Sequence, residues 1–455
     1  MIFVPTKLIE RSAMKRLLKL LINIKLTIIE KVEVIGGPDI WDMSLVLHVR
    51  PTKGQLLRCP KCGKRMPYYD EGRGIRDWRA LDLGVMKVYL RGRAPRVMCS
   101  EHGALVASVP WARHDAWFTY SFEEQVAWMV QRSMQKTVIS QIFRIDWETV
   151  GAIAKRVEEG VRAEMPNPFD GLVNIGIDET SYRRGHKYLT VVVNHDTGAV
   201  VWAHIKHGKE VLTKFFGLLT VKQREAIRNV TGDGAGWITE CVEEFCPNAK
   251  RLLDAFHIVA WATDALDSVR RRIVNDLRKE ERAQQKEKRK RGRPKKGEEA
   301  KPSVSAQIKG ARFAVLKNPE DLTESQQAKI ELLALENGQL YRAYMYKERL
   351  RLLLKLPVDE ATAELDAWLS SACRSRIPEI VELSKKIRRH RERIIDTVAS
   401  GLSNARVEAI NNKIKVTIKL AYGFRNLDNL IGLIYLRCSN LPLALPGRRP
   451  HSKAA

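Results

Sequence analysis

The chain has 455 residues, and its 79 lysines and arginines against 53 aspartates and glutamates leave a formal net charge of +26. A surface with that excess repels itself and attracts polyanions, so nucleic acid is the first partner that the composition indicates; a merely basic soluble enzyme is the alternative. Hydrophobic residues make up 44% of the chain, which excludes global disorder, and no apolar run approaches the roughly 20 residues that span a bilayer.

The first regular element predicted is a short basic amphipathic helix over residues 14–29. Lys19 and Lys25 interrupt its apolar residues and no small-residue cleavage site follows, so it does not fit a signal peptide, and Met14 is a candidate start. Seven cysteines in so long a chain do not make a disulfide framework. A reducing cytoplasm is therefore the expected setting.

Two pairs of metal-binding residue types follow, Cys59 with Cys62 and Cys99 with His102. Two thiolates one tight turn apart form half of a tetrahedral zinc site, and the second pair supplies the other half. Thirty-six residues separate the pairs, more than the about 15 to 20 of a zinc ribbon, and a short β-hairpin insert would absorb the difference. The spacing predicts structural zinc; a chance grouping of reduced thiols is the alternative.

The next segment has the spacing of a helix-turn-helix. Helices are predicted over residues 122–132, 137–143 and 147–157, with Asp146 as the N-cap of the last. In such a unit the last helix enters the DNA major groove. The predicted base-contacting residues are Glu148, Thr149, Ala152 and Lys155. Taken alone, the pattern also fits any small three-helix bundle.

From residue 172 the chain changes to β-branched runs that predict three consecutive strands, followed by helix, strand, helix and strand. The first strand ends in Asp178, and the strand after the first helix ends in Asp233. Carboxylates at these strand ends describe an RNase H-like α/β core, in which the two strands lie side by side. Adjacent carboxylates repel and are stable mainly with divalent metal between them. Either aspartate alone is equally compatible with an ordinary cap or turn.

A late helix, beginning near Ser403, supplies the candidate third acid, Glu408. On a helical wheel its polar neighbours lie within about 60° of it: Asn404, Asn411, Asn412, Lys415 and Lys419. The opposite side is apolar and is predicted to pack on the sheet. This pattern places Glu408 among amides and lysines, which suits a metal site beside a phosphate backbone, with Lys415 and Lys419 contacting DNA.

The 174 residues between Asp233 and Glu408 require a separate insertion, which is helical in spacing. Within it, residues 286–296 hold eight cations and one acid. Arg291 and Arg293 lie in an Arg-Gly-Arg-Pro sequence that resembles an AT-hook, whose extended arginines enter a narrow minor groove. The composition favours the alternative, a disordered linker that binds DNA without sequence preference.

Six motifs together resemble the bacterial insertion-sequence DDE transposases of the ISL-three family. They are CPKCG, CSEHG followed by VPWARHD, NIGIDETSYRRGHKYLTVV, VTGDGAGW, LLDAFHIV and SNARVEAINNKIKVTIKLAYGFRN. The resemblance spans nearly the whole chain. It implies a small zinc-binding β module, a helix-turn-helix, and an RNase H-like core with a mixed five-stranded sheet and flanking helices, interrupted by an all-α insertion.

The resemblance further implies that Asp178, Asp233 and Glu408 form a DDE triad that holds two Mg²⁺ (or Mn²⁺) ions. One ion would activate water or a 3′-hydroxyl, and the other would steady the leaving 3′-oxygen, so that one site cuts the element end and joins it to target DNA. The Asp254-x-x-His257 element is similar to one in related transposases, and a helix N-cap with a packed histidine explains it equally well.

The implied partner is double-stranded DNA, as terminal inverted repeats and as target, handled by a homodimer or larger synaptic assembly at the bacterial nucleoid. A catalytically inactive DNA-binding regulator and an RNase H-type nuclease are the rival functions. The expected domains are an N-terminal helix with strands (1–55), a zinc module (56–112), a helix-turn-helix (113–165), the first part of the core (171–256), a helical insertion (257–395) with a basic linker (278–300), and the C-terminal core helix (396–445).

Overall fold

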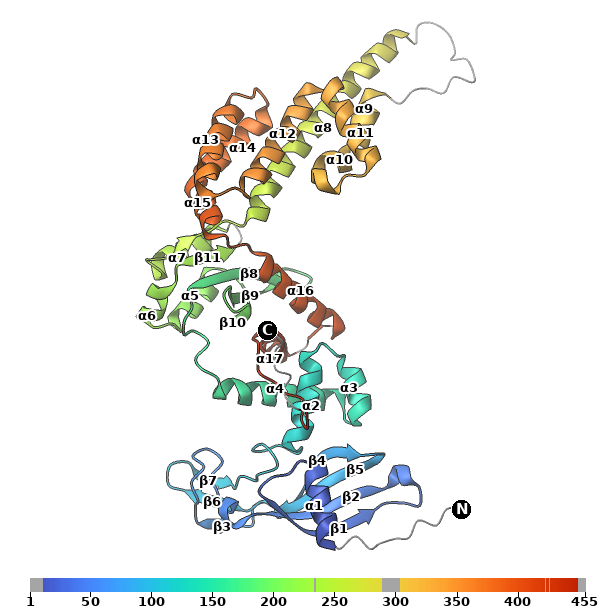
Figure 1. The fold of residues 1–455 in the computed structure, drawn as a ribbon, viewed down its shortest axis with the longest axis vertical. Helices are drawn as coiled ribbons and strands as arrows, with labels where there is room; N and C mark the ends of the chain where they lie inside the picture. Colours follow the sequence, from blue (N-terminus) through green and yellow to red (C-terminus); the bar gives the residue numbers. More distant parts are fainter. Residues whose placement is uncertain (1–10, 233–234, 289–302, 422, 425, 449–455) are drawn as a thin grey trace. The chain divides into compact units, whose positions relative to one another are not determined.

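A computed structural model describes residues 11–232, 235–288, 303–421, 423–424 and 426–448 (Figure 1). The chain divides into two compact units, residues 1–166 with 413–455 and residues 167–412. Within the described ranges, no helix combines the length and the apolar composition needed to cross a membrane.

The first unit begins with α1 (Arg11–Leu21), which packs on a four-stranded sheet. The strands of this sheet, in spatial order, are β1 (Thr27–Ile35), β2 (Ser44–Pro51), β5 (Met86–Arg93) and β4 (Ile75–Leu83). The helix predicted over residues 14–29 ends at Leu21, because Asn23 and Leu26 adopt left-handed backbone conformations that break it. The isoleucines that follow belong to β1.

A three-stranded sheet carries the zinc-ligand candidates. Its strands, in spatial order, are β3 (Tyr68–Asp70), β6 (Arg96–Cys99) and β7 (Gly103–Val106). The hairpin predicted between the two ligand pairs is formed by β4 and β5, which pair antiparallel, and β5 also pairs in parallel with β2. Trp78, Val88 and Leu90 from this insert are buried in the core of the four-stranded sheet. The insert thus completes a neighbouring core.

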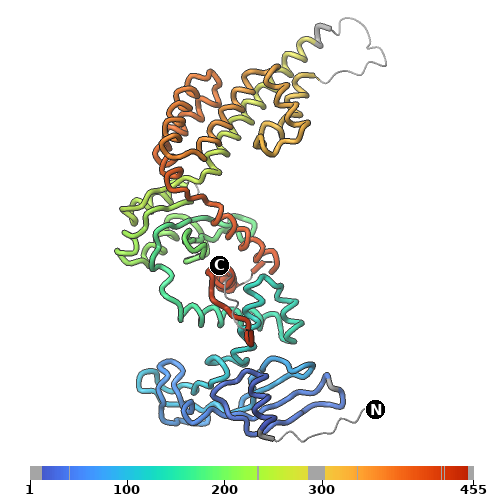
Figure 2. The backbone as a smooth tube through the Cα atoms, in the orientation of Figure 1, coloured from blue at the N-terminus to red at the C-terminus, as the bar shows by residue number. Residues whose placement is uncertain are grey.

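Three helices follow, close to the predicted positions. They are α2 (Tyr120–Gln131), α3 (Lys136–Phe143) and α4 (Trp147–Glu164). The C-terminal helix α17 (Leu427–Cys438), which the sequence did not predict, packs on α4 and α2, and Figure 2 shows this red segment beside the cyan helices. Leu433 and Leu436 share one apolar core with Phe122, Val126 and Val150.

The second unit contains the predicted mixed five-stranded sheet. Its strands, in spatial order, are β10 (Ala199–Ile205), β9 (Lys187–Asn194), β8 (Asn174–Arg183), β11 (Asn229–Gly232) and β12 (Lys250–Arg251). The first three are antiparallel, and β8, β11 and β12 are parallel. The predicted RNase H-like strand order is therefore present, although β12 is only two residues long.

Helices cover the two faces of this sheet. On one face, Ile175 and Ile177 of β8 pack with α5 (Lys209–Gly217) and α7 (Gly236–Phe245). A short helix that was not predicted, α6 (Val221–Ala226), follows α5 and buries none of its residues. The opposite face receives α16 (Ala405–Leu420). A Cβ atom on Gly176 would lie 2.4 Å from Cγ2 of Val407, so a glycine is required where α16 crosses β8. The unit boundary falls inside α16, after Asn412.

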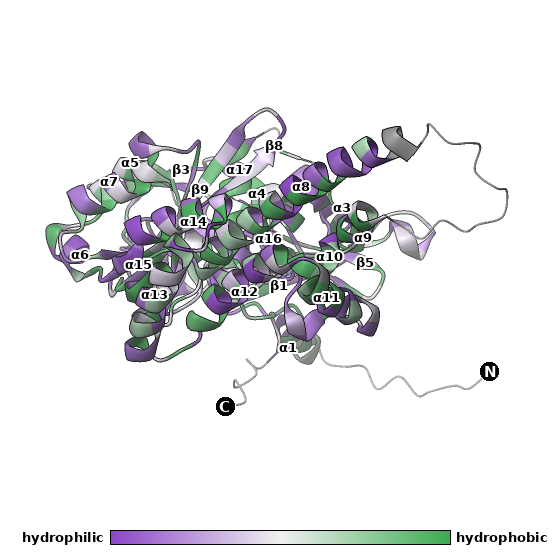
Figure 3. Cartoon of the chain, turned by 90° about the horizontal axis from the view of Figure 1, so that it is seen from above, coloured by the Kyte–Doolittle hydropathy of each residue, from purple (hydrophilic) through white to green (hydrophobic). Residues whose placement is uncertain are grey.

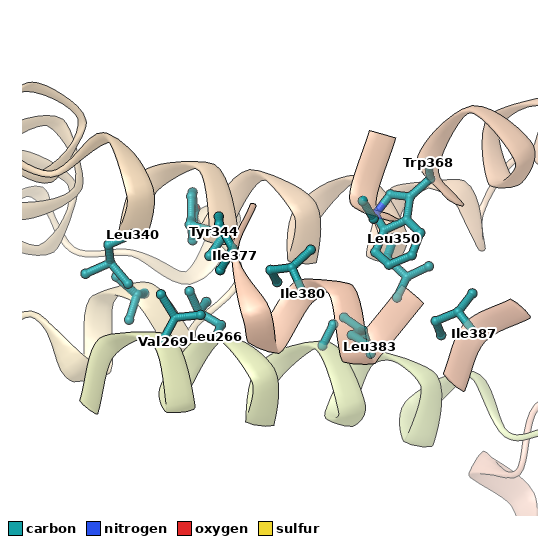
Figure 4. Packing of buried hydrophobic residues seen from close by; sticks show 14 of the residues in the cluster. Leu266, Val269, Leu340, Tyr344, Leu350, Trp368, Ile377, Ile380, Leu383 and Ile387 are labelled. Carbon is teal, nitrogen blue, oxygen red and sulfur yellow. The ribbon is translucent and has the colours of Figure 1, made fainter. Parts of the chain in front are cut away.

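The insertion is helical throughout its described residues. Its helices are α8 (Ala255–Lys288), α9 (Val304–Gly310), α10 (Arg312–Leu316), α11 (Glu324–Glu336), α12 (Gly338–Leu353), α13 (Val358–Cys373), α14 (Pro378–Arg389) and α15 (Arg391–Ser400). Figure 4 shows their shared core, in which Leu266 and Val269 of α8 meet Ile380 and Leu383 of α14. Toward its C-terminal end α8 becomes mainly hydrophilic (Figure 3).

Candidate catalytic, zinc and DNA-binding sites

Asp178 lies near the middle of β8 and not at a strand end as predicted, because β8 continues to Arg183. α16 holds its carboxylate. Oδ1 accepts a hydrogen bond from the backbone N–H of Glu179 (2.7 Å), and Oδ2 accepts one from Nδ2 of Asn411 (2.6 Å). Asn411 is only 6% exposed, and its Oδ1 has no hydrogen-bond partner among the described atoms. A buried, unsatisfied acceptor therefore lies beside the first candidate acid.

Asp233, the second candidate acid, lies outside the residues that the structure describes. The residue before it, Gly232, pairs in parallel with Ile177, the residue before Asp178. A Cβ on Gly232 would approach the carbonyl oxygen of Ile177 to 2.6 Å, so glycine permits this close pairing. The described part of β11 thus runs side by side with β8, as predicted for the two acid-bearing strands.

A buried polar chain fixes α16 on the sheet. The Thr231 hydroxyl of β11 donates to Oδ1 of Asn404 (2.9 Å), and Nε2 of His195 lies 2.7 Å from the same hydroxyl oxygen. Because the hydroxyl proton goes to Asn404, His195 must donate through Nε2. Burial, and then the nearby Arg406, lower the pKa of His195, which favours this neutral form. Arg406 also donates to the backbone carbonyl of His195.

The predicted polar face of α16 is divided in two. Glu408, Asn412, Lys415 and Lys419 are exposed, but Asn404 and Asn411 are buried against the sheet. The prediction that these two amides flank an exposed Glu408 is therefore wrong. On the wheel they lie between Glu408 and the apolar Val407, and Thr231 and Asp178 supply the polar partners that make their burial favourable.

Asp254 follows β12, at the level where β11 ends and where Asp178 lies on β8. Its Oδ1 accepts from the N–H of Phe256 (3.1 Å), as expected for the N-cap of α8. The residue is 5% exposed, and its Oδ2 has no hydrogen-bond partner in the described part of the chain. Oδ1 thus caps the helix, while Oδ2 is a buried acceptor without a hydrogen-bond donor among the described residues. His257 is half-buried one turn along α8.

A cavity of about 430 Å³ opens beside Asp178. Its lining residues are Asp178, Glu179, His186, Tyr188, His207, Ala235 and Ile238. Nδ1 of His207 lies 3.5 Å from Oε1 of Glu179, and the Tyr188 and His207 rings meet edge-to-face at 4.9 Å. Of these residues the sequence singled out only Asp178, although Glu179, His186 and Tyr188 lie in the same motif. The cavity gives a substrate access to this aspartate.

Cys59, Cys62, Cys99 and His102 form one cluster whose ligand atoms all lie within 4.8 Å of one another. The sulfurs of Cys62 and Cys99 are 3.8 Å apart, and a tetrahedral ion with bonds of about 2.3 Å to sulfur requires close to this separation. The backbone N–H of Cys62 lowers the pKa of the Cys59 thiol to about 7, which favours the thiolate that zinc binds. The residues present therefore fit a zinc ion.

The predicted base-contacting residues occupy one side of α4. Glu148 and Ala152 are exposed, and Thr149 and Lys155 are half-exposed. Asp146 occupies the N-cap position of α4, but its side chain makes no capping hydrogen bond. Arg291 and Arg293 of the AT-hook-like sequence lie outside the described residues.

Comparison with known protein families assigns the three regions that contain these sites to one kind of protein. A transposase family model, for the DDE transposases of family ISL3, matches residues 175–434. Two further models match residues 55–102, as the zinc-finger of transposase IS204/IS1001/IS1096/IS1165, and residues 107–158, as the helix-turn-helix domain of transposase family ISL3. The chain belongs to the ISL3 transposase family.

Individual transposases agree with this assignment. The chain is 44% identical over 440 residues to the transposase for insertion sequence element IS1557 of Mycobacterium tuberculosis, in two strains, covering 96% of this chain and 98% of the relative. The transposase for element IS1001 of Bordetella parapertussis is 24% identical over 401 residues, or 87% of this chain and 92% of that protein.

The predictions of an insertion-sequence transposase, a helix-turn-helix and a zinc-binding module are thereby confirmed. An ISL3 transposase is an enzyme of DNA cleavage and transfer, and its helix-turn-helix domain binds DNA.

Proposed function

We propose that this transposase binds the terminal inverted repeats of its insertion sequence and cleaves and joins DNA strands with Asp178, Asp233 and Glu408. The observation that carries the proposal is the contact between Asn411 and Asp178, because it ties the helix bearing Glu408 to the strand bearing the first acid. The parallel pairing of Gly232 with Ile177 supports the place of Asp233 in the same site.

The site fits a hard divalent cation. Mg²⁺ prefers oxygen ligands, and two buried oxygens, Oδ1 of Asn411 and Oδ2 of Asp254, lack hydrogen-bond partners in the described residues near this sheet edge. Asp178, Asp233 and Glu408 would hold two Mg²⁺ or Mn²⁺ ions. When bound, these ions make water or a 3′-hydroxyl more acidic and offset the charge that develops on the phosphate oxygens.

The chain's own residues orient the reaction. Asn411 keeps the Asp178 carboxylate in one rotamer, and Asn404 with Thr231 fixes the register of α16, from which the exposed Glu408 projects. The cavity beside Asp178 admits the DNA strand. Asp254 and His257 are proposed as auxiliary residues. No covalent protein–DNA intermediate is required, because the attacking oxygen comes from water or DNA.

Replacing Asn411 with alanine is expected to weaken metal binding by 10- to 100-fold, on the order seen when a residue that orients a metal ligand is removed. The Mg²⁺ concentration for half-maximal cleavage should rise by that factor, and calorimetric Mn²⁺ binding to the DNA-free protein should weaken in parallel. Val416→Ala, at an exposed position of the same helix, should change neither. Unchanged Mn²⁺ binding by Asn411→Ala would remove Asn411 from this role.

End recognition is assigned to α4, through Glu148, Thr149 and Lys155, with phosphate contacts from Arg291, Arg293, Lys415 and Lys419. Lys155→Ala should weaken binding to a terminal-repeat duplex by about 5- to 10-fold and reduce the salt slope of the affinity by about 1. Fluorescence anisotropy at several salt concentrations measures both. Lys53→Ala, at an exposed position elsewhere in the first unit, is the control. An equal loss of affinity in Lys53→Ala would contradict the assignment of end recognition to α4.

The proposal includes one structural zinc ion on Cys59, Cys62, Cys99 and His102. It also includes a homodimer or larger synaptic assembly, because two element ends must be joined together, and action at the nucleoid in the bacterial cytoplasm. Sedimentation of the protein with and without paired end DNA tests the assembly.

The decisive experiment incubates the purified protein with Mg²⁺ or Mn²⁺, a labelled duplex carrying the terminal repeat, and target plasmid. Cleavage at the repeat and joining of the freed 3′-end to the plasmid are expected. Binding without cleavage would indicate the inactive regulator. Cleavage of RNA–DNA hybrids with no preference for the repeat would indicate the nuclease.

A further inference from the structure

The helical insertion carries a group of basic side chains that form no ion pair with a carboxylate among the described residues. α14 turns Ile380, Leu383 and Ile387 into the insertion core (Figure 4). Its outer side and C-terminal end carry the residues that we call the α14 cationic surface: Lys386, Arg388, Arg389 and His390. Within the described residues, none of these four side chains forms an ion pair with aspartate or glutamate.

Neighbouring cations on the same helices are paired. Lys385 lies 2.7 Å from Glu382, and Arg391 lies 2.7 Å from both Asp366 and Glu392. The α14 cationic surface therefore differs from its neighbours: four basic side chains occupy five consecutive positions, and within the described residues only Asp264, near Lys386, offers an opposite charge, without forming an ion pair. Like charges this close repel one another, and an anion from outside the chain would relieve that repulsion.

The pKa values of two members are lowered mainly by burial, with a further contribution from neighbouring cations. Burial and then Arg389 lower the pKa of Lys386, and Asp264 partly offsets them. Burial, followed by Arg393, Arg389 and Lys386, lowers the pKa of His390. The surface is thus electropositive at positions that are already partly removed from water.

Trp261 of α8 fixes part of the surface. Nζ of Lys386 lies 3.9 Å from the centroid of the Trp261 ring, and the His390 ring lies 5.4 Å from it. A lysine held over an indole face loses less freedom on binding an anion than a lysine that projects into solvent. Trp261 is six residues after Ala255, the first residue of α8, which corresponds to roughly 9 Å along the helix axis.

This distance links the surface to the proposed catalytic edge. Asp254 immediately precedes α8 and follows β12, at the level where β11 ends and where Asp178 lies on β8. A B-DNA duplex advances about 3.4 Å per base pair, so a site 9 Å away falls about three base pairs from a phosphate at that edge. The net charge of +26 and the confirmed class of substrate favour DNA over an acidic protein as the anion.

We propose that Lys386, Arg388, Arg389 and His390 bind phosphates of the duplex within a few base pairs of the cleaved position. This inference rests on the proposed function, because it places the reacting phosphate beside Asp178. It assigns the helical insertion a direct role in holding DNA. The helix-turn-helix then recognises the repeat, and the insertion aligns the strand for cleavage.

The test is the salt dependence of DNA binding by the full-length chain. Arg388→Ala with Arg389→Ala should reduce the slope of log affinity against log salt by about 2, since each lost phosphate contact removes about 0.9. At 0.15 M salt the affinity should fall at least tenfold. Arg388→Lys with Arg389→Lys should retain most of the slope, because the charge is kept.

A matched control removes the same charge from the same subdomain. Lys309 and Lys329 are exposed on α9 and α11, and their joint replacement by alanine should leave the slope within about 0.5 of the wild type. Ethylation of phosphates close to the cleaved position should inhibit binding of the wild type and have no effect on the double arginine variant. Thermal unfolding confirms that the variants are folded.

Three results would overturn the inference. The slope could be unchanged in the double arginine variant, it could fall equally in the lysine control, or ethylation could interfere equally with the wild type and the variant. If the double arginine variant keeps the salt slope of DNA binding but no longer binds an acidic protein that the wild type binds, the surface is a protein-binding site. These binding measurements use neither divalent metal nor cleavage. An error in the proposed catalytic triad would therefore not affect them and would appear only in the cleavage rate of Asp178→Asn.

Discussion

Asp178→Asn is expected to abolish strand cleavage and strand transfer while DNA binding is retained. The substitution keeps the size of the side chain but removes the negative charge that a divalent cation requires, and it turns one Oδ into an amide that repels the Nδ2 donor of Asn411. A loss of at least roughly 10³-fold in the cleavage rate is expected, which corresponds to about 4 kcal/mol of transition-state stabilisation.

End-labelled duplex measures the rate with Mg²⁺ and with Mn²⁺, and anisotropy measures binding of the same duplex. Asp196→Asn is the matched control, because Asp196 belongs to the same unit and accepts a hydrogen bond from Asn174 on the neighbouring strand. It should cleave at close to the wild-type rate. If Asp178→Asn also cleaves normally, the catalytic assignment is wrong, whatever the binding result.

Cys99→Ser is expected to remove zinc and unfold the zinc module. Cys99 is 2% exposed, and its sulfur lies 3.8 Å from Cys62 Sγ and 3.4 Å from His102 Nδ1, so the substitution removes one of the four clustered ligands. Apparent binding free energies of structural zinc are on the order of 10 kcal/mol. That exceeds what the small sheet of β3, β6 and β7 contributes by packing, because few of its residues are buried.

Zinc content per chain and limited proteolysis provide the measurements. The variant should lose one equivalent of zinc and become sensitive to cleavage around residues 55–107. Cys373→Ser, at the exposed cysteine of α13, should keep both the zinc and the resistance. A full equivalent of zinc in Cys99→Ser would contradict the four-ligand site, and protease resistance without zinc would show that packing alone holds the module.

Local patterns predicted the strands that bear Asp178 and Asp233 and the two halves of the zinc cluster. Strand periodicity and short ligand spacings depend on residues near one another in the chain, so the sequence contains the necessary information. The partners of Asn404 and Asn411 depend on residues more than 170 positions away. A helical wheel gives the direction of each amide, but not the hydroxyl or carboxylate that makes its burial favourable.

The same limit explains why the pairing of β5 with β2 and the packing of α17 on α4 were not predicted. The insert between the zinc ligands reads as a hairpin in the sequence, and only the alignment of β5 with β2 shows that it belongs to the adjacent sheet. α17 is an ordinary amphipathic segment whose apolar side meets α4 across 270 residues of chain. Such long-range pairings depend on how all the residues of the four-stranded sheet core and of the α2–α4 core pack together.

The packing of α17 on the DNA-reading helices bears on how copies of the element lose function. A gene copy with a stop codon before residue 427 encodes a protein whose helix-turn-helix lacks Leu433 and Leu436 and exposes the apolar residues they cover. Such a product is expected to lose the proposed end recognition together with the final helix. We therefore expect decayed copies that lack α17 to yield no shortened repressor that occupies the repeats of intact copies.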